Sequence, residues 1–239
     1  MTKPSPFAPY QDDPTVQFLL TLLAVRHGKK QGKPVHNDDA LLTDLGIAQV
    51  TATGLLLANR YDGAKPGFGF ASNLPRTPQT ATILMREMGV TEPEELVVSR
   101  AGFGYQWLAD NCGQHDFEAI DRLSGAPHGS ITAAQMAEEM PTASLMAHGM
   151  LTGALATVLS DWSEVDMETG FDHLPDGSSI AILANHSPII EFLPHREDWA
   201  TVTKRGEASG IIIPVVGWKN GRIEVVRGAE CFDAGSLES

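Results

Sequence analysis

Apolar and polar residues alternate along this chain in blocks that predict strands and helices in turn. The first block, residues 19–25, is nearly all apolar and has polar neighbours, which is typical of a short strand buried on both faces of a sheet. Arg26, His27 and Gly28 follow it directly. Ligands gather beyond the carboxyl ends of strands in open α/β sheets, so the strand is expected to place Arg26 and His27 at a binding edge.

Further strand-and-helix units follow this first strand. Thr43 is suited to cap the N-terminus of an amphipathic helix. Residues 67–72 predict a second short strand, and the turn after it holds Arg76 just before a helix over residues 79–88. Residues 95–99 predict a third strand. Such alternation is typical of a parallel sheet with helices on its faces.

The pattern changes in the middle of the chain. Residues 102–129 have the composition of a loop, and two helical stretches follow over 131–139 and 143–162. We expect residues 102–162 to form a helical cap inserted over the sheet. A separate domain is not expected, because the later strands must return to the same sheet.

The last part of the chain predicts another buried strand and a β-hairpin. Residues 178–184 predict this strand, which is apolar from Ile180 to Ala184 and leads to His186, an arrangement that repeats the one at His27. Residues 211–216 and 222–226 flank Asn220-Gly221, which is a hairpin turn signal.

These elements predict one α/β domain of three layers, in which helices flank a mainly parallel central sheet. The domain is expected to cover residues 19–239, and the proline-rich residues 1–18 are expected to form a flexible arm. A length of 239 residues is in the range of one large α/β domain.

Composition and charge exclude several classes of partner. The net charge is −13 and there is no basic stripe, so nucleic acid is not an expected partner. Cys112 and Cys231 have no metal-binding spacing and are expected to be reduced. No signal peptide is apparent, and residues 19–25 are too short to span a bilayer, so we expect a cytoplasmic protein that does not bind membranes.

Positive charge gathered at one edge of an acidic protein indicates an anion site. Arg26 with His27, Arg76 and His186 each follow a predicted strand, so a parallel sheet brings them together. Two guanidinium groups match phosphoryl oxygens, and a neutral imidazole can attack phosphorus. The arginines also supply the charge that Mg²⁺ provides elsewhere, so neither a metal nor a cofactor is expected. The pattern alone leaves open which imidazole attacks.

The sequence resembles the histidine phosphatase superfamily, whose fold is phosphoglycerate mutase-like. The resemblance rests on four stretches in order, which contain Arg26-His27-Gly28, Leu42-Thr43, Arg76 with Thr80-Ala81, and His186. It implies that His27 is the phosphorylated nucleophile, that Arg26 and Arg76 bind the phosphoryl group, and that His186 completes the pocket.

The proton donor to the leaving group is not identified by this resemblance. Family members place a glutamate after the third strand or an aspartate after the second histidine, whereas this chain has no carboxylate in residues 99–105 and has Ser187 after His186. Asp110 is the first candidate and Asp116 the second, and an ordinary loop aspartate is the alternative. Tyr105, Trp107 and Phe117 are candidates for lining the substrate pocket or, alternatively, for packing the cap.

The sequence therefore predicts a phosphatase that hydrolyses phosphomonoesters or related phosphoryl groups through a phosphohistidine on His27. Its partner is expected to be a phosphorylated small molecule or a phosphoprotein. A phosphomutase of the same fold and a non-catalytic phosphate-binding module are the alternatives.

Overall fold

A computed structural model of the chain describes residues 5–32, 39–98, 110–162, 172–218 and 223–233. A seven-stranded sheet runs through the molecule in the order β3-β2-β4-β1-β5-β6, and β7 also pairs with β5. The strands are β1 (Val16–Arg26), β2 (Phe68–Ala71), β3 (Val97–Val98), β4 (Ser178–Asn185), β5 (Gly210–Trp218), β6 (Ile223–Val225) and β7 (Glu230–Phe232). The helices are α1 (Asp44–Arg60), α2 (Arg76–Glu87), α3 (Pro93–Leu96), α5 (Gln114–Ser124), α6 (Ala133–Glu139) and α7 (Pro141–Trp162), with short 3-10 helices η1 (Ile190–Phe192) and η2 (Arg196–Asp198).

The sheet is mixed, and its parallel half carries the predicted site residues. Strands β3, β2, β4 and β1 are mutually parallel, whereas β5, β6 and β7 join through antiparallel pairs. The predicted hairpin is confirmed by the β5–β6 pairing of Val215 with Val225. Its turn signal, Asn220-Gly221, lies outside the described residues. The third antiparallel strand, β7, was not predicted from the sequence.

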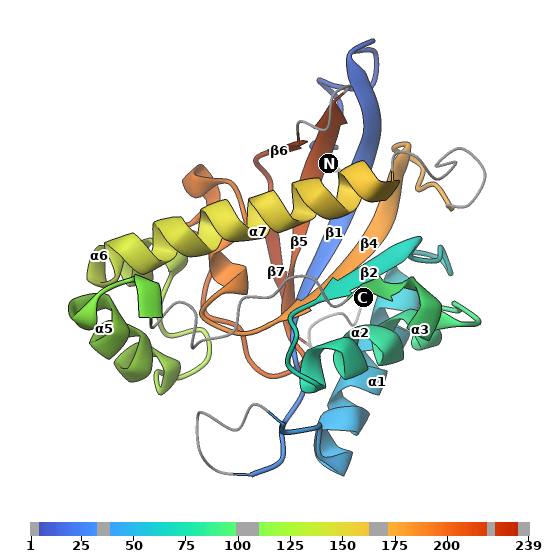
Figure 1. Cartoon of the computed structure of the whole chain (residues 1–239). Helices are drawn as coiled ribbons and strands as arrows, with labels where there is room; N and C mark the ends of the chain where they lie inside the picture. The colour runs from blue at the N-terminus through green and yellow to red at the C-terminus, as the bar shows by residue number, and fades with distance from the viewer. Residues whose placement is uncertain (1–4, 33–38, 99–109, 163–171, 219–222, 234–239) are drawn as a thin grey trace.

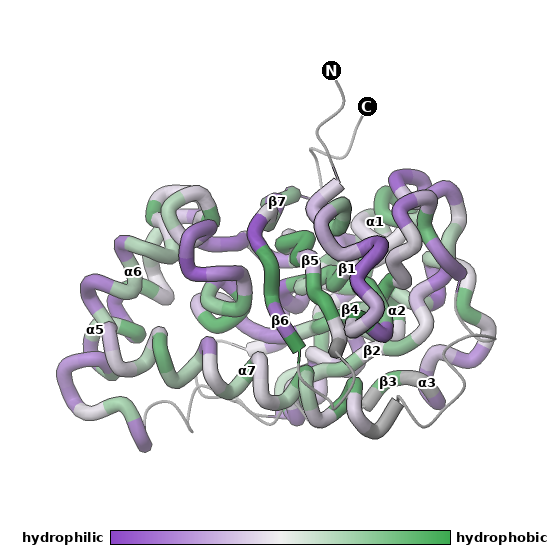
Figure 2. Tube along the Cα trace, turned by 90° about the horizontal axis from the view of Figure 1, so that it is seen from above, coloured by the Kyte–Doolittle hydropathy of each residue, from purple (hydrophilic) through white to green (hydrophobic). Residues whose placement is uncertain are grey.

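Helices cover both faces of the sheet, which confirms the three-layer prediction. In β1, Leu22 and Ala24 point to the face covered by α5, α6, α7 and η1, whereas Leu23 and Val25 point to the face covered by α1 and α2. Figure 1 shows α7 crossing one face of the strands, and Figure 2 shows the strands between α7 and α1. Both faces of β1 are therefore buried, as its apolar sequence predicts.

The middle of the chain is more helical than predicted. Residues 114–124, expected as loop, form α5, whose Ile120 and Leu123 are buried. The strand predicted over 95–99 is wrong in its first part, because Glu95 lies in the helical turn α3 and β3 begins at Val97. Ser99 lies outside the described residues. Pro93 at the start of α3 and the acidic residues of its first turn both favour this turn of helix.

Helix α7 packs on the sheet as part of the core. Its inner side chains, including Leu151 and Leu155, are fully buried in the same cluster as the strands. Among the described residues, the 20-residue window Pro141–Ser160 is long and apolar enough to cross a membrane, with 39% of the window buried. The inner face of α7 packs on the sheet, as the helices of an α/β domain do.

The beginning of the chain contacts the sheet. Strand β1 starts at Val16, inside the segment assigned to an arm, and Phe7 packs on Leu19 and Val216 with 1% of its surface exposed. The flexibility of residues 1–18 and the domain bounds stay predictions.

Candidate active site

The carboxyl ends of β1 and β4 bring two histidines side by side. Arg26 and Asn185 are register partners in the parallel β1–β4 pair, and the backbone N–H of His27 donates to the Asn185 carbonyl at 3.1 Å. The ring centroids of His27 and His186 lie 5.0 Å apart with an interplanar angle of 66°. The convergence predicted from two distant stretches of sequence is therefore present.

A close crossing of the chain fixes the loop that carries His27. The loop after β1 passes over the first turn of α1, which Thr43 caps by accepting from the backbone N–H of Gly46 at 3.0 Å. A Cβ atom added to Gly28 would lie 2.4 Å from the Gly46 carbonyl oxygen, and one added to Gly46 would lie 2.1 Å from the Lys29 carbonyl oxygen. Only glycine permits this approach of two backbones.

Arg76 approaches the histidines from a third strand end. Helix α2 begins at Arg76, slightly earlier than predicted, and the side chain is 5% exposed. Its charge helps to lower the pKa of both His27 and His186, so the guanidinium lies near both rings. The first turn of α2 contains no acidic residue, so its backbone N–H groups also favour an anion here.

His27 is held as a neutral imidazole in a defined tautomer. Burial lowers its pKa to about 3; the hydrogen bond to Gly28 acts in the opposite direction, and the charges of Arg76 and Arg26 add to the lowering. Nδ1 lies 2.7 Å from the Gly28 carbonyl oxygen. Because a carbonyl only accepts, Nδ1 carries the proton and Nε2 keeps its lone pair.

His186 is held by a buried pair of hydroxyl groups. Its Nε2 lies 3.0 Å from Ser72 Oγ, which in turn lies 2.7 Å from Thr77 Oγ1. Burial lowers the pKa of His186 well below its usual value, and the neighbouring His27 and Arg76 act in the same direction. Ser72 follows β2, so this contact joins the β2 end to the β4 end.

Two buried donors at the end of β1 and β4 have unfilled hydrogen-bonding capacity. Arg26 Nη1 donates to the Arg205 carbonyl at 2.8 Å, but Arg26 Nε and Asn185 Nδ2 have no hydrogen-bond partner. A buried donor without a partner is costly, and such groups are concentrated at functional sites.

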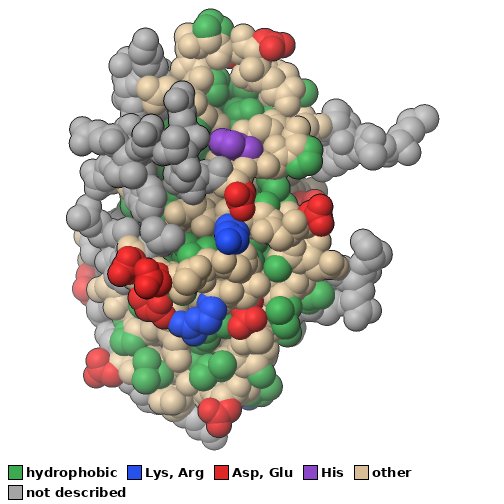
Figure 3. Space-filling model, turned by 90° about the vertical axis from the view of Figure 1, so that its right-hand side faces the viewer, with side chains coloured by type: hydrophobic (Ala, Val, Ile, Leu, Met, Phe, Trp, Pro, Cys, Tyr) green, Lys and Arg blue, Asp and Glu red, His purple; other side chains and the backbone are tan. Residues whose placement is uncertain are grey.

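The chain as a whole is acidic, so the cations near the two histidines are a local concentration of positive charge. Among the charged side chains on the face of the molecule in Figure 3, acidic ones outnumber basic ones, in keeping with the net charge of −13. Lys30 adds a further positive charge that lowers the pKa of both histidines, whereas its neighbour Lys29 is exposed.

Glu191, which was not predicted from the sequence, contacts two segments that border the site. It is fully buried in η1, and Ser187 and the backbone of Arg205 donate to it. A single charged residue within the apolar run of residues 188–193 was the signal that would have found it.

The structure places the two candidate proton donors, Asp110 and Asp116, in different surroundings. Asp116 is wrong as a candidate: it is buried, and its Oδ2 accepts from the backbone N–H of Ala143 at 2.7 Å, so it caps the first turn of α7. Asp110 is exposed and stays a prediction. Residues 99–105, with Tyr105, and Trp107 lie outside the described residues, whereas Phe117 packs partly buried on the core under α7.

No group of three histidine, cysteine or carboxylate residues placed to hold a metal ion occurs in the described part of the chain. The chemistry that these neighbouring side chains can perform is anion binding combined with nucleophilic attack by an imidazole.

This fold and this pair of histidines define an α/β protein with an imidazole and guanidinium site at the carboxyl edge of its sheet. The family model described as "Histidine phosphatase superfamily (branch 1)" matches residues 22–97, which contain Arg26, His27 and Arg76. Residues 22–97 therefore match the pattern of this superfamily, whose members include phosphatases and mutases. No curated protein matches the sequence.

Solved structures resemble the whole chain at low sequence identity. A phosphoglycerate mutase from Bacillus anthracis str. Sterne is 17% identical with a TM-score of 0.52, and the match covers 93% of this chain and 97% of that one. A mycobacterial glucosyl-3-phosphoglycerate phosphatase in complex with inorganic phosphate is 19% identical, with a TM-score of 0.48 and coverage of 92% and 99%. The protein histidine phosphatase SixA in complex with tungstate is 11% identical, with a TM-score of 0.47 and coverage of 91% and 99%. The first of these shows the phosphoglycerate mutase-like fold.

Proposed function

We propose that the protein is a metal-independent phosphatase that hydrolyses phosphomonoesters or related phosphoryl groups by two transfers through His27. The observation that carries the proposal is the state of His27: a neutral imidazole with Nδ1 tied to the Gly28 carbonyl, so that the Nε2 lone pair is available beside two guanidinium groups. An imidazole that was protonated at neutral pH would have no lone pair for attack.

The first transfer forms a bond between His27 Nε2 and phosphorus. The bond between phosphorus and the ester oxygen breaks, and the leaving group departs with the electron pair and takes up a proton. Arg26 and Arg76 bind the phosphoryl oxygens, where their charge stabilises the transition state. His186, buried 5.0 Å from His27 between ring centroids, closes the other side of the phosphoryl group.

The second transfer returns the enzyme to its starting state. A water molecule attacks phosphorus, the bond to His27 Nε2 breaks, and inorganic phosphate leaves. Because the donor of the leaving-group proton is not identified, esters with good leaving groups and phosphoramidates are the substrates of choice for a first assay. The natural substrate is proposed to be a phosphorylated small molecule or a phosphoprotein in the cytoplasm.

A panel of phosphoesters, assayed in the presence of EDTA, tests the proposal. Wild type is expected to release phosphate, and His27→Ala is expected to lose at least about a thousandfold in rate. Hydrolysis that survives in His27→Ala would refute the nucleophile, and hydrolysis that EDTA abolishes would refute independence from metal. Transfer of the phosphoryl group to a second substrate hydroxyl would identify a mutase, and phosphate binding without turnover would identify a binding module.

A further inference from the structure

Glu191 is a buried carboxylate without a side-chain cation as its partner. It lies in η1, five residues after His186, and none of its surface is exposed. Among the described residues it takes part in no ion pair: Oε1 accepts two hydrogen bonds and Oε2 accepts none. Burying a carboxylate with only one of its oxygens hydrogen-bonded is costly, so its presence here indicates a role that an apolar residue would not fill.

The two hydrogen bonds of Glu191 connect two segments that border the candidate site. Ser187 Oγ, one residue after His186, donates to Glu191 Oε1 at 2.5 Å. The backbone N–H of Arg205 donates to the same oxygen at 2.7 Å. The carboxylate thus ties the segment that follows β4 to the loop that precedes β5.

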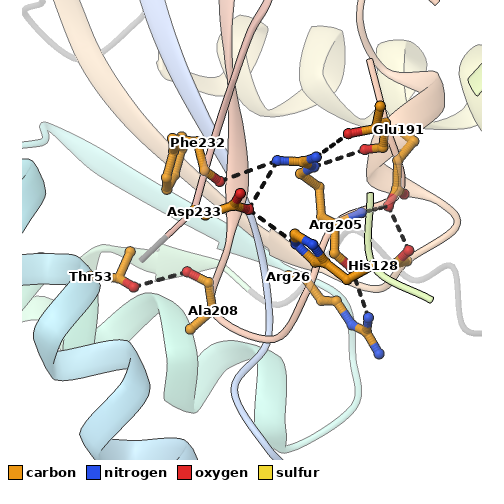
Figure 4. Close-up of polar contacts among 10 residues, drawn as sticks. Arg26, Thr53, His128, Glu191, Arg205, Ala208, Phe232 and Asp233 are labelled. Carbon is orange, nitrogen blue, oxygen red and sulfur yellow. Dashed lines mark hydrogen bonds and ion pairs between the residues drawn. The ribbon is translucent and has the colours of Figure 1, made fainter. Parts of the chain in front are cut away.

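The peptide groups of Arg205 are held on both sides. Glu191 accepts from its N–H, and its carbonyl accepts from Arg26 Nη1 at 2.8 Å. The Arg205 side chain donates to the Thr203 carbonyl at 2.8 Å and to Asp233 Oδ1 at 3.1 Å, which fixes the residue further. Figure 4 shows Glu191, Arg205 and Arg26 in succession, with Arg205 between the other two.

We propose that Glu191 is a positioning residue for the phosphoryl-binding Arg26. By fixing the Arg205 backbone, it holds the carbonyl that binds one arm of the Arg26 guanidinium, so that the rest of the fork is presented to the phosphoryl oxygens. Arg26 Nε, buried with no hydrogen-bond partner, is then available to the ligand. This inference rests on the proposed function, because it assigns Arg26 to phosphoryl binding.

A purely structural role of Glu191 predicts a different result from a role that acts through Arg26. If Glu191 only holds two segments together, its removal weakens folding and ligand binding by the same amount whether or not Arg26 is present. If it orients Arg26, its removal has no further effect on ligand binding once the guanidinium is gone. A double-mutant cycle separates the two cases.

The cycle uses wild type, Glu191→Ala, Arg26→Ala and the double variant, with orthovanadate affinity measured by calorimetry and kcat/KM measured on an aryl phosphate. Glu191→Ala is expected to weaken vanadate binding about tenfold or more in the wild-type background and less than about twofold in the Arg26→Ala background. Glu191→Gln keeps the carbonyl oxygen that accepts both hydrogen bonds, so it is expected to restore most of the lost affinity. Glu197→Ala is the matched control, because Glu197 is an exposed carboxylate of η2 that pairs with Arg227 at 2.7 Å.

An equal loss of vanadate affinity on removal of Glu191 in both backgrounds would overturn the assignment. A Glu191→Gln variant that is folded by circular dichroism but does not restore vanadate affinity would overturn it as well. If Glu191→Ala does not fold, the comparison of Glu191→Gln with Glu191→Asp, which withdraws the carboxylate by one methylene, carries the test: only Glu191→Asp is expected to lose affinity. The vanadate cycle is independent of turnover, so failure to find a hydrolysed ester leaves it valid. Absence of vanadate and phosphate binding in wild type would overturn both proposals.

Discussion

The neutral state of His27 predicts how the stability of the protein depends on pH. Burial lowers the pKa of this histidine from 6.5 to about 3 in the folded chain. Above pH 6.5 the ring is neutral in both the folded and the unfolded chain, and it makes no contribution. As the pH falls from 6.5 towards 3, the unfolded chain binds a proton that the folded chain does not bind, so the free energy of unfolding decreases over this window.

The size of this effect follows from the width of the window. Each pH unit below the pKa of the unfolded chain costs about 1.4 kcal/mol of stability until the pKa of the folded chain is reached. Between pH 7 and pH 5, His27 is therefore expected to remove about 2 kcal/mol, which is a large part of the stability of an ordinary domain.

Urea unfolding at pH 7, 6 and 5, followed by circular dichroism, measures this contribution. Wild type is compared with His27→Asn, which cannot bind the proton, and with His115→Asn, a control at a histidine whose side chain is 81% exposed. The buffers must contain no phosphate, because a bound anion would stabilise the folded chain by mass action. Wild type and the control are expected to lose about 2 kcal/mol more than His27→Asn between pH 7 and pH 5. An identical pH dependence for wild type and His27→Asn would refute the reasoning, since His27 would then bind protons equally well in both states.

Three further predictions concern the supports of the site. Thr43→Ala removes the cap of α1 and is expected to lower the free energy of unfolding by about 1 kcal/mol, with Thr43→Ser close to wild type; no change in urea midpoint would contradict the capping role. Asp116→Ala removes the acceptor for the Ala143 N–H and is expected to destabilise by about 1–2 kcal/mol. Its kcat on good and poor leaving groups is expected to be unchanged, and a selective loss on poor leaving groups would reinstate Asp116 as the acid. Gly28→Ala places a Cβ atom 2.4 Å from the Gly46 carbonyl oxygen, so a loss of about 2 kcal/mol or more with a fall in phosphatase rate is expected, whereas wild-type stability would show that the crossing relaxes freely.

The core of the candidate site was predictable because its signals are local. Arg26-His27 and His186 each follow a short apolar run that is typical of a buried strand, and parallel strands bring such ends together. The register pairing of Arg26 with Asn185 confirms this for β1 and β4. Thr43 was predictable for the same reason, since a cap acts within its own turn of helix.

Features that depend on distant partners were not predictable. The hydrogen bond from Arg26 to the Arg205 carbonyl joins residues 179 positions apart, and the sequence around neither residue predicts it. The contact of Glu191 with the Arg205 backbone forms only when η1 packs against the loop that precedes β5. Helix α5 was missed because Gly113 precedes it with no side-chain cap, although Phe117, Ile120 and Leu123 recur at helical spacing.

Trapping of the phosphorylated protein tests the central claim most directly. Wild type is mixed with an aryl phosphate, quenched in denaturant at alkaline pH within the first turnovers, digested and analysed by mass spectrometry. The account predicts one phosphoryl group on the peptide that contains His27, stable in base and lost in mild acid, and absent from His27→Ala. A phosphoryl group on His186 or on a carboxylate or hydroxyl side chain, or rapid turnover with no covalent phosphoryl group, would contradict it.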